Sequence, residues 1–198
     1  MLSCTDLVIE IMSLYDKSMS AELRQFDFDP EKATEAILYV ASKLPEKNAT
    51  FYIILKILYL ADKMHLSNYG RFISGDSYSA MKHGPVPSGA YDIIKYVRGD
   101  GYFCIDHARN SFSVNLDTNY VLPLRNVDKD LFSESDLQCL DKMIVDHGSK
   151  TFSDIRAISH DAAWDNAGDN EMMSLKDIVQ TLPNADDLLN HLSDPFPE

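Results

Sequence analysis

The chain has 198 residues, of which 45% are hydrophobic and 25% are charged, as is typical of a folded globular protein. Its net charge is −13. This excess argues against wrapping nucleic acid or docking on an anionic membrane, because both need a surplus of lysine and arginine. The N-terminus has no signal-peptide pattern, and the most apolar run, residues 51–60, has about half of the ~20 residues that a membrane span needs. We therefore expect a cytoplasmic protein that binds neither nucleic acid nor membranes.

Residues with catalytic or metal-binding potential are dispersed along the chain. Cys4, Cys104 and Cys139 form no close pair, which argues against a disulfide framework and against a zinc site. The common phosphate-binding, dinucleotide-binding, zinc-protease and hydrolase motifs are absent, and no two of the six histidines have helical metal-ligand spacing. Ser159, His160 and Asp161 are the residue types of a catalytic triad, but they are adjacent in the sequence. On one helix their side chains would point in different directions and could not relay a proton. We predict no catalytic residue, no metal and no cofactor; a metal or catalytic site assembled from residues far apart in the sequence is the alternative that stays open.

Acidic residues are concentrated in the last third of the chain. Residues 126–198 have 16 acidic and five basic residues, whereas residues 1–125 have 15 and 13. Two interpretations are open. The segment is either a solvated surface that keeps the protein in solution, or a face that attracts a basic partner and raises its association rate.

The first segments of the chain are predicted to be helical. Residues 6–23 are amphipathic. Asp29 and Pro30 mark the start of a second helix, because aspartate is favoured at the N-cap and proline in the first turn. Pro45 ends that helix after Leu44. The side chains expected to face the core are Ala33, Ile37, Val40, Ala41 and Leu44.

The most apolar helix is predicted over residues 51–66, after Thr50 at its N-cap. A helical wheel divides this segment into a broad apolar sector and one narrow polar stripe. The polar stripe consists of Tyr52, Lys56, Tyr59 and Lys63. We expect this helix to be central in the fold.

Two titratable residues fall inside the apolar sector of the same helix. Asp62 and His65 are three residues apart, so they can reach each other or a common partner. Because a buried charge needs a partner, we interpret Asp62 as a structural residue that ties down the following loop, for example through Arg71. A catalytic acid–base pair is the alternative.

Proline and glycine divide the next segment. Gly70 suits a left-handed helix stop, and residues 72–83 have the pattern of short extended pieces. Gly84-Pro85-Val86-Pro87 excludes a helix and predicts a rigid turn, since each proline fixes its own φ and restrains its predecessor. Ser88 is then predicted to cap a helix that runs to Arg98.

The remaining segments predict a hairpin followed by helices. Residues 102–105 and 112–116 flank a polar turn at residues 108–110 and read as a β-hairpin. Further helices are predicted from Ser133, which has capping-box spacing to Asp136, to Gly148, over residues 152–164 with Ala162 inward, from Ser174 to Leu182, and over residues 186–192. The residues after 192 are expected to fray. The predicted class is α+β, predominantly helical, with a small antiparallel hairpin or sheet.

One stretch of the chain resembles a known family. It contains Lys56, Leu58-Tyr59, Ala61-Asp62, His65-Leu66, Tyr69-Gly70-Arg71, Ile73-Ser74-Gly75, Tyr78, Ala80-Met81, above all His83-Gly84-Pro85-Val86-Pro87, and then Tyr91, His160 and Trp164. This combination resembles the Panacea domain family, the SocA-like antitoxins of bacterial and phage toxin–antitoxin systems. We accordingly predict an N-terminal helical segment (residues 1–28), a Panacea-like core (residues 29–125) and acidic C-terminal helices packed on that core (residues 126–198).

The resemblance implies a binding protein and not an enzyme. Members of the family neutralise a toxin protein, usually encoded next door, by direct binding. Some act as adaptors that deliver a partner to a protease, which is the first alternative here. Others have an added DNA-binding domain, which we do not expect in this acidic chain with its short N-terminal segment. The second alternative is an unrecognised enzyme that uses Asp62, His65 and His83.

The family-like residues divide into two predicted groups. The partner-binding candidates are Tyr52, Lys56, Tyr59, Lys63, Tyr69, Arg71, Met81, His83, Pro85 and Pro87. The residues predicted to maintain the structure are Asp62, His65, Gly70, Tyr78, Gly84, His160 and Trp164. A rigid turn with tyrosine neighbours suits an interface, because tyrosine is favoured at binding hot spots and little entropy is lost on binding. The alternative is that Tyr78, Gly84 and Pro85 form the core and its corner.

Overall fold

The computed structural model describes residues 23–101 and 105–193. Most of the predicted amphipathic stretch (residues 6–23), most of the first predicted hairpin strand (residues 102–105) and the chain after residue 193 lie outside the described residues, as do Cys4 and Cys104. Cys139 is buried and has a free thiol.

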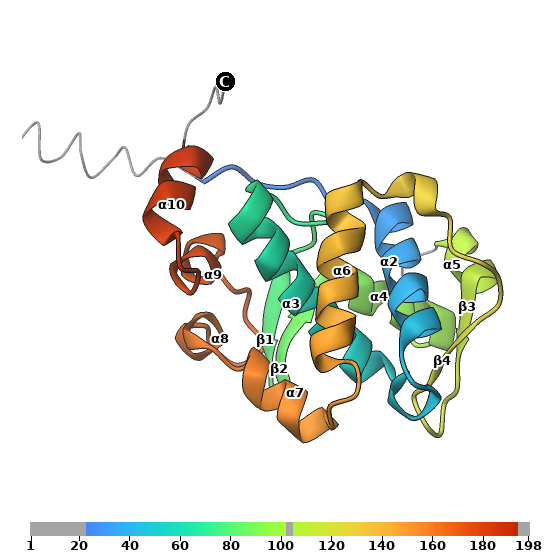
Figure 1. The fold of residues 1–198 in the computed structure, drawn as a ribbon. Helices are drawn as coiled ribbons and strands as arrows, with labels where there is room; N and C mark the ends of the chain where they lie inside the picture. The colour runs from blue at the N-terminus through green and yellow to red at the C-terminus, as the bar shows by residue number, and fades with distance from the viewer. Residues whose placement is uncertain (1–22, 102–104, 194–198) are drawn as a thin grey trace, which may run out of the picture.

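Helices make up most of the described chain (Figure 1). The α-helices are α2 (Pro30–Lys43), α3 (Phe51–Tyr69), α4 (Ser88–Arg98), α5 (Asp106–Ser111), α6 (Glu134–His147), α7 (Phe152–Ser159), α8 (Ala162–Asn166), α9 (Leu175–Gln180) and α10 (Ala185–Ser193), with 3-10 turns η1 (Glu46–Asn48) and η2 (Lys129–Leu131). The strands are β1 (Tyr78–Met81), β2 (Gly84–Pro87), β3 (Phe112–Val114) and β4 (Val121–Pro123).

Helices α2 and α3 follow the predicted pattern. The carboxylate of Asp29 accepts a hydrogen bond from the Lys32 amide at 2.9 Å and so caps α2, whose predicted inward side chains are all buried. Thr50 stands at the N-cap of α3, although its side chain forms no capping hydrogen bond. Gly70 ends α3 in the left-handed conformation, with φ 69°.

Helix α3 lies between two hydrophobic cores. On one side it packs with α2, α4 and α6, and Figure 1 shows α6 crossing in front of α3 with α2 beside it. The second core is built on Tyr59, Leu66 and Tyr78 and is covered by side chains from α8, α9 and α10. The C-terminal helices are therefore needed to bury one flank of the central helix.

The segment predicted as a rigid turn at residues 84–87 is instead strand β2, which pairs antiparallel with β1. The tight turn is formed by Lys82 and His83. Because Pro85 and Pro87 are two residues apart, both missing N–H groups fall on one edge of the strand, and the other edge remains available to β1. The opposite edge of β1 pairs with residues 171–173 through backbone hydrogen bonds.

The predicted capping role of Ser88 is wrong. The hydroxyl of Ser88 bonds to Ser79 Oγ at 2.9 Å, and the first amides of α4 are capped from a distance by Asp76. The amides of Gly89 and Ala90 each donate to the Asp76 carboxylate at 2.8 Å.

The predicted hairpin around residues 108–110 is also wrong, because these residues belong to α5. Strand β3 pairs with β4, so that Val114 lies opposite Val121. The turn between them is stabilised by Asn115, whose side chain accepts hydrogen bonds from the amides of Asp117 and Thr118 at 3.0 and 2.9 Å. A side chain that competes for backbone amides in this way favours a turn over a continuing strand.

The single helix predicted over residues 152–164 is broken into α7 and α8. His160 is extended, and Asp161 caps α8 by accepting hydrogen bonds from the amides of Ala163 and Trp164. The break turns Ala162 outward, contrary to the prediction, and buries Ala163. The capping box of Ser133 and Asp136 at α6 and the Ser174 cap of α9 are confirmed.

The fold class is confirmed as α+β and predominantly helical, with two small antiparallel pairs of strands among the described residues. Within the same residues, no helix is long and apolar enough to cross a membrane.

Candidate functional site

Most of the polar stripe of α3, whose residues are predicted to bind a partner, faces the interior of the protein, and Tyr52 is its exposed member. Lys56 and Tyr59 are buried, and Lys63 is half-buried. The hydroxyl of Tyr59 and the ammonium of Lys63 both donate to Asp161 Oδ2, at 2.8 and 2.5 Å. The same carboxylate that caps α8 therefore attaches the C-terminal helices to α3.

Lys56 connects α3 to strand β2. Its Nζ donates to the carbonyl oxygen of Pro85 at 2.5 Å, and the side chain is fully covered. Burial, together with the positive charge of Arg156, lowers the pKa of Lys56 to about 7. No carboxylate forms an ion pair with Lys56 or Arg156 in the described part of the chain.

Gly84 is the point where the family-like residues meet. Its φ of 100° lies in the region that favours glycine. A Cβ at this position would lie 2.7 Å from His160 Cδ2 and 3.0 Å from Lys56 Nζ. The imidazole of His160 stacks on Trp164 with ring centres 3.9 Å apart, and Trp164 Nε1 donates to the Met81 carbonyl at 3.0 Å. These contacts fix the β1–β2 hairpin against α3, α7 and α8.

A groove of about 190 Å³ opens beside this junction. We call it the hairpin groove; its walls include Tyr52, Lys56, Lys82, His83, Tyr91 and Phe152. The ring of Phe152 lies 5.6 Å from that of Tyr52 and 5.9 Å from that of His83. The groove thus has aromatic walls, and the buried residue Lys56 contributes to its lining.

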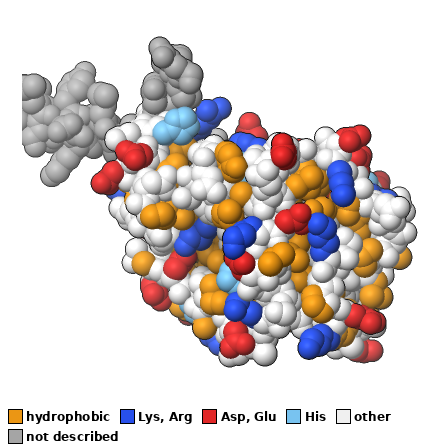
Figure 2. All heavy atoms as spheres, viewed as in Figure 1, with side chains coloured by type: hydrophobic (Ala, Val, Ile, Leu, Met, Phe, Trp, Pro, Cys, Tyr) orange, Lys and Arg blue, Asp and Glu red, His pale blue; other side chains and the backbone are white. Residues whose placement is uncertain are grey.

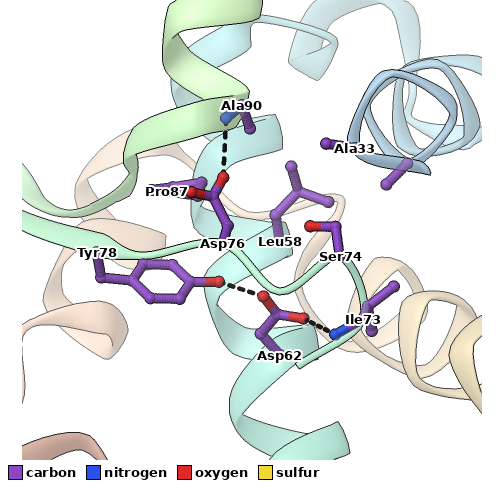
Figure 3. Close-up of a pocket in the computed structure, with 10 residues that line it drawn as sticks. Ala33, Leu58, Asp62, Ile73, Ser74, Asp76, Tyr78, Pro87 and Ala90 are labelled. Carbon is purple, nitrogen blue, oxygen red and sulfur yellow. Dashed lines mark hydrogen bonds between the residues drawn. The ribbon is translucent and has the colours of Figure 1, made fainter. Parts of the chain in front are cut away.

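Asp62 ties down the loop after α3, as predicted, but not through Arg71. One carboxylate oxygen accepts from the Ile73 amide at 2.7 Å, and the other accepts from the Tyr78 hydroxyl at 2.5 Å (Figure 3). Burial raises the pKa of Asp62 to about 6.

A second buried carboxylate, Asp76, lies near Asp62 and was missed by the sequence analysis (Figure 3). Besides Gly89 and Ala90, the amide of Ser77 also donates to it. Burial raises the pKa of Asp76 to about 6 as well. The only signal in the sequence was a charged residue among the short extended pieces predicted over residues 72–83, with nothing to indicate that two of its partners, Gly89 and Ala90, lie further along the chain.

His65 belongs to a separate buried cluster. Its Nδ1 lies 2.9 Å from the Arg71 carbonyl oxygen, and its Nε2 lies 3.1 Å from Asp136 Oδ1. Asp136 also pairs with Lys32 at 2.6 Å and with Arg71 at 2.9 Å. Burial raises the pKa of Asp136, but the hydrogen bonds from His65 and Lys32 outweigh it and lower the pKa below its usual value. This cluster joins α2, α3 and α6.

The remaining partner-binding candidates are divided between surface and interior. Tyr52 and Tyr69 are 40% and 49% exposed, and His83 is exposed. Arg71 and Met81 are half-buried, whereas Pro85 and Pro87 are buried in β2. Lys56 is buried but belongs to the lining of the hairpin groove. Tyr59, Pro85 and Pro87 are buried and lie outside that lining, so they can act only by shaping the surface above them.

Asp62, His65 and His83 are not brought together as a catalytic constellation. Asp62 bonds to Tyr78 and Ile73, while His65 contacts Arg71 and α6. His83 lies at the hairpin groove instead. Each of the three has its own surroundings, and the two buried groups use their polar atoms to hold the chain.

The fold and its packed hairpin junction define a helical α+β domain built around a Gly-Pro-Val-Pro strand. Residues 54–165 match the family model described as "Antitoxin SocA-like, Panacea domain". This match covers more than half of the chain, so the chain belongs to that family, and the family supports an antitoxin-type role and a toxin partner in general. No curated protein and no solved structure matches the chain significantly.

Proposed function

We propose that the protein is an antitoxin that neutralises a cognate toxin protein, encoded in a neighbouring gene, by binding it directly through the face around the hairpin groove. The observation that supports this most is the position of the groove. It opens beside the junction of Gly84 and His160, where the family-like residues converge, and Lys56 belongs to both the groove and the junction.

Rigidity of this face favours binding. The hairpin is held by the Lys56 bond to Pro85, by the Trp164 bond to Met81 and by the pairing of β1 with residues 171–173. A surface that is already ordered loses little conformational entropy when a partner docks. Exposed tyrosine and histidine at the rim supply the flat amphipathic side chains that interfaces favour.

The buried polar groups Asp62 and His65 favour binding over catalysis, because their polar atoms are already used in bonds within the core. Asp62 accepts one hydrogen bond at each oxygen inside the core, and His65 lies in a buried cluster that joins three helices. Neither group is placed to reach a substrate. The protein therefore acts, in this proposal, through complex formation and has no catalytic residue.

Co-expression tests the proposal. The chain is expressed together with each neighbouring open reading frame, growth is scored, and the tagged chain is purified. We expect one neighbour to be toxic alone, to be tolerated with this protein, and to copurify with it. Rescue in which the neighbour protein disappears from the cells would instead indicate a proteolytic adaptor. Absence of any toxic neighbour would contradict the proposal.

Matched variants locate the contact face. Tyr52→Asp introduces a negative charge at the rim of the hairpin groove. Tyr69→Asp introduces one at the other end of α3. Val145→Asp introduces one on α6, at a residue that is 78% exposed. We expect Tyr52→Asp to abolish copurification and rescue while melting normally, and Val145→Asp to retain both. If Tyr69→Asp loses copurification and rescue but Tyr52→Asp retains them, the interface lies at the other end of α3.

A further inference from the structure

The hairpin groove combines aromatic walls with basic groups that lack acidic partners among the described residues. Lys56 contributes to the lining, and Lys82 and His83 lie at the hairpin turn. Arg156 follows Phe152 by one turn of α7, and its guanidinium reaches the Lys82 carbonyl at 3.5 Å. In a chain with a net charge of −13, this local gathering of positive groups stands apart from the overall acidity.

Several donors of these groups have no acceptor in the part of the chain that the structure describes. Lys56 has three N–H donors, and its one acceptor there is the Pro85 carbonyl. The Nε of Arg156 is buried and has no hydrogen-bond partner among the same residues. Buried donors of this kind usually find a partner, because leaving them unpaired is costly. An acceptor supplied from outside would satisfy them.

The dimensions of the groove restrict what can enter. Its volume of about 190 Å³ is below the range of roughly 300–1,000 Å³ that is usual for small-molecule sites. It suits one large side chain of a protein. Tyr52, Tyr91 and Phe152 offer aromatic contact area for the apolar part of that side chain.

We infer that the hairpin groove is a carboxylate-binding subsite that receives an acidic side chain or the terminal carboxylate of the bound partner protein. The aromatic walls contact its carbon atoms, and the basic lining residues Lys56, Lys82 and His83 face its charge. Arg156 lies behind this lining, close to Lys82 and Lys56, and adds positive charge there. This inference rests on the proposed function, since it assigns the chemistry of the toxin segment that enters the groove.

Binding at this subsite is coupled to protonation. Burial and the charge of Arg156 lower the pKa of Lys56 to about 7. His160, whose pKa is also lowered by burial, lies beside Lys56 at Gly84. A bound carboxylate stabilises the charged form of Lys56 and raises its pKa. Affinity for a carboxylate should therefore fall as pH rises through about 7, and binding above that pH should take up a proton.

A small aromatic carboxylate probes the subsite without the toxin. The full chain is titrated with phenylacetate, and with the neutral analogue phenylacetamide, by two-dimensional NMR at about pH 6 and about pH 8, on either side of the Lys56 pKa. We expect phenylacetate to perturb the amides of the groove residues Tyr52, Lys82, His83 and Phe152, more strongly at the lower pH. Phenylacetamide should bind at least about tenfold more weakly, the factor expected for one charge-assisted hydrogen bond.

Variants assign the effect to the basic groups. Lys56→Met should weaken phenylacetate binding about tenfold and flatten its pH dependence. Arg156→Gln gives a second test in a less buried residue, in case Lys56→Met does not fold. Lys47→Met, at an exposed lysine away from the groove, is the matched control and should bind like the unmodified chain. Equal binding by all of these proteins would overturn the inference.

Other outcomes separate this inference from the proposed function. If inorganic phosphate binds the groove and phenylacetate does not, the carboxylate assignment is wrong. If the chain copurifies with a toxin but neither Lys56→Met nor Arg156→Gln weakens phenylacetate or toxin binding, the antitoxin proposal stands and the subsite fails. If phenylacetate binds as expected and no neighbour is toxic, the subsite stands and the partner is not a toxin.

Discussion

At the scale of single residues, two buried carboxylates carry much of the loop structure around the hairpin. Asp62 holds Ile73 and Tyr78, and Asp76 holds the first amides of α4. Both are buried, and neither has a basic partner that pairs with it in the described residues. Their stabilising effect therefore depends on hydrogen bonds from neutral groups.

Removing the Tyr78 hydroxyl tests this dependence. In Tyr78→Phe one oxygen of Asp62 loses its donor inside the core, and we expect the free energy of unfolding to fall by about 1–3 kcal/mol. Tyr69→Phe, at an exposed tyrosine in α3, is the control and should change stability by less than about 0.5 kcal/mol. Urea unfolding of the three proteins measures both effects, and equal stabilities would show that the bond to Asp62 contributes nothing.

The raised pKa of Asp62 predicts a pH-dependent stability difference. Because its folded pKa of about 6 lies above the ordinary value, its contribution is fully present below about pH 4 and is lost as pH rises through about 6. Asp62→Asn cannot titrate, so the stability advantage of the unmodified chain over this variant should shrink as pH rises. Unfolding measured across this range checks the sign; an advantage that grows with pH would show that the folded pKa is depressed. If Asp62→Asn melts like the unmodified chain but loses the protein's function, the result would favour the enzyme alternative.

At the scale of elements, the β1–β2 hairpin is fixed from several sides at Gly84. Two features act there together: the positive φ and the close approach of His160 and Lys56. Gly99 allows the effect of the positive φ to be measured without the close approach. Its φ of 92° is similar, but a Cβ added to it would meet no described atom within 4 Å.

Alanine substitution at the two glycines measures the packing at the junction. Gly99→Ala should lose about 1 kcal/mol of stability from backbone strain alone. Gly84→Ala should lose clearly more, since the new methyl group must displace the His160 ring from Trp164, and it should also reduce toxin binding at the neighbouring groove. Thermal melting and tryptophan fluorescence report on both changes. Equal losses of stability in the two variants would mean that moving the His160 ring costs no measurable free energy.

Elements set by local signals could be predicted from the sequence, and elements set by distant contacts could not. The Asp29 cap, the Gly70 stop and the Ser133 capping box are local, and all three are confirmed. The break at His160 depends on Asp161 contacting Tyr59, far away in the chain, and the cap of α4 comes from Asp76. For the site, the family-like residues were identified, but a helical wheel could not show that Lys56 and Tyr59 lie under the C-terminal helices.

At the scale of the whole molecule, part of the acidity of the C-terminal third is offset by basic side chains that lie close to it in space. On the face in Figure 2, acidic and basic side chains are interspersed with apolar ones over α2, α3 and α6. Part of the acidity of residues 126–198 is paired: Asp136, Asp141, Asp146 and Asp161 each form an ion pair. The other acidic side chains of this segment are the candidates for attracting a partner.

Salt dependence of association tests whether the acidic residues attract the toxin. If they do, the association rate should fall steeply as salt rises, while the dissociation rate changes less, because screening acts on long-range attraction. Stopped-flow or surface-based kinetics with the cognate toxin measure both rates. An association rate that does not respond to salt would leave the acidic helices as a solvated surface.

The two-sided burial of α3 has a consequence for how the protein is made. Tyr59 and Leu66 are completely buried by side chains from residues 163–192, which leave the ribosome long after α3 does. During synthesis, α3 can pack against α2 and then α6 while its second flank still exposes aromatic and aliphatic surface. Such exposed apolar surface is what chaperones and proteases recognise. This flank therefore stays partly uncovered until the C-terminal helices have been translated and have packed on it.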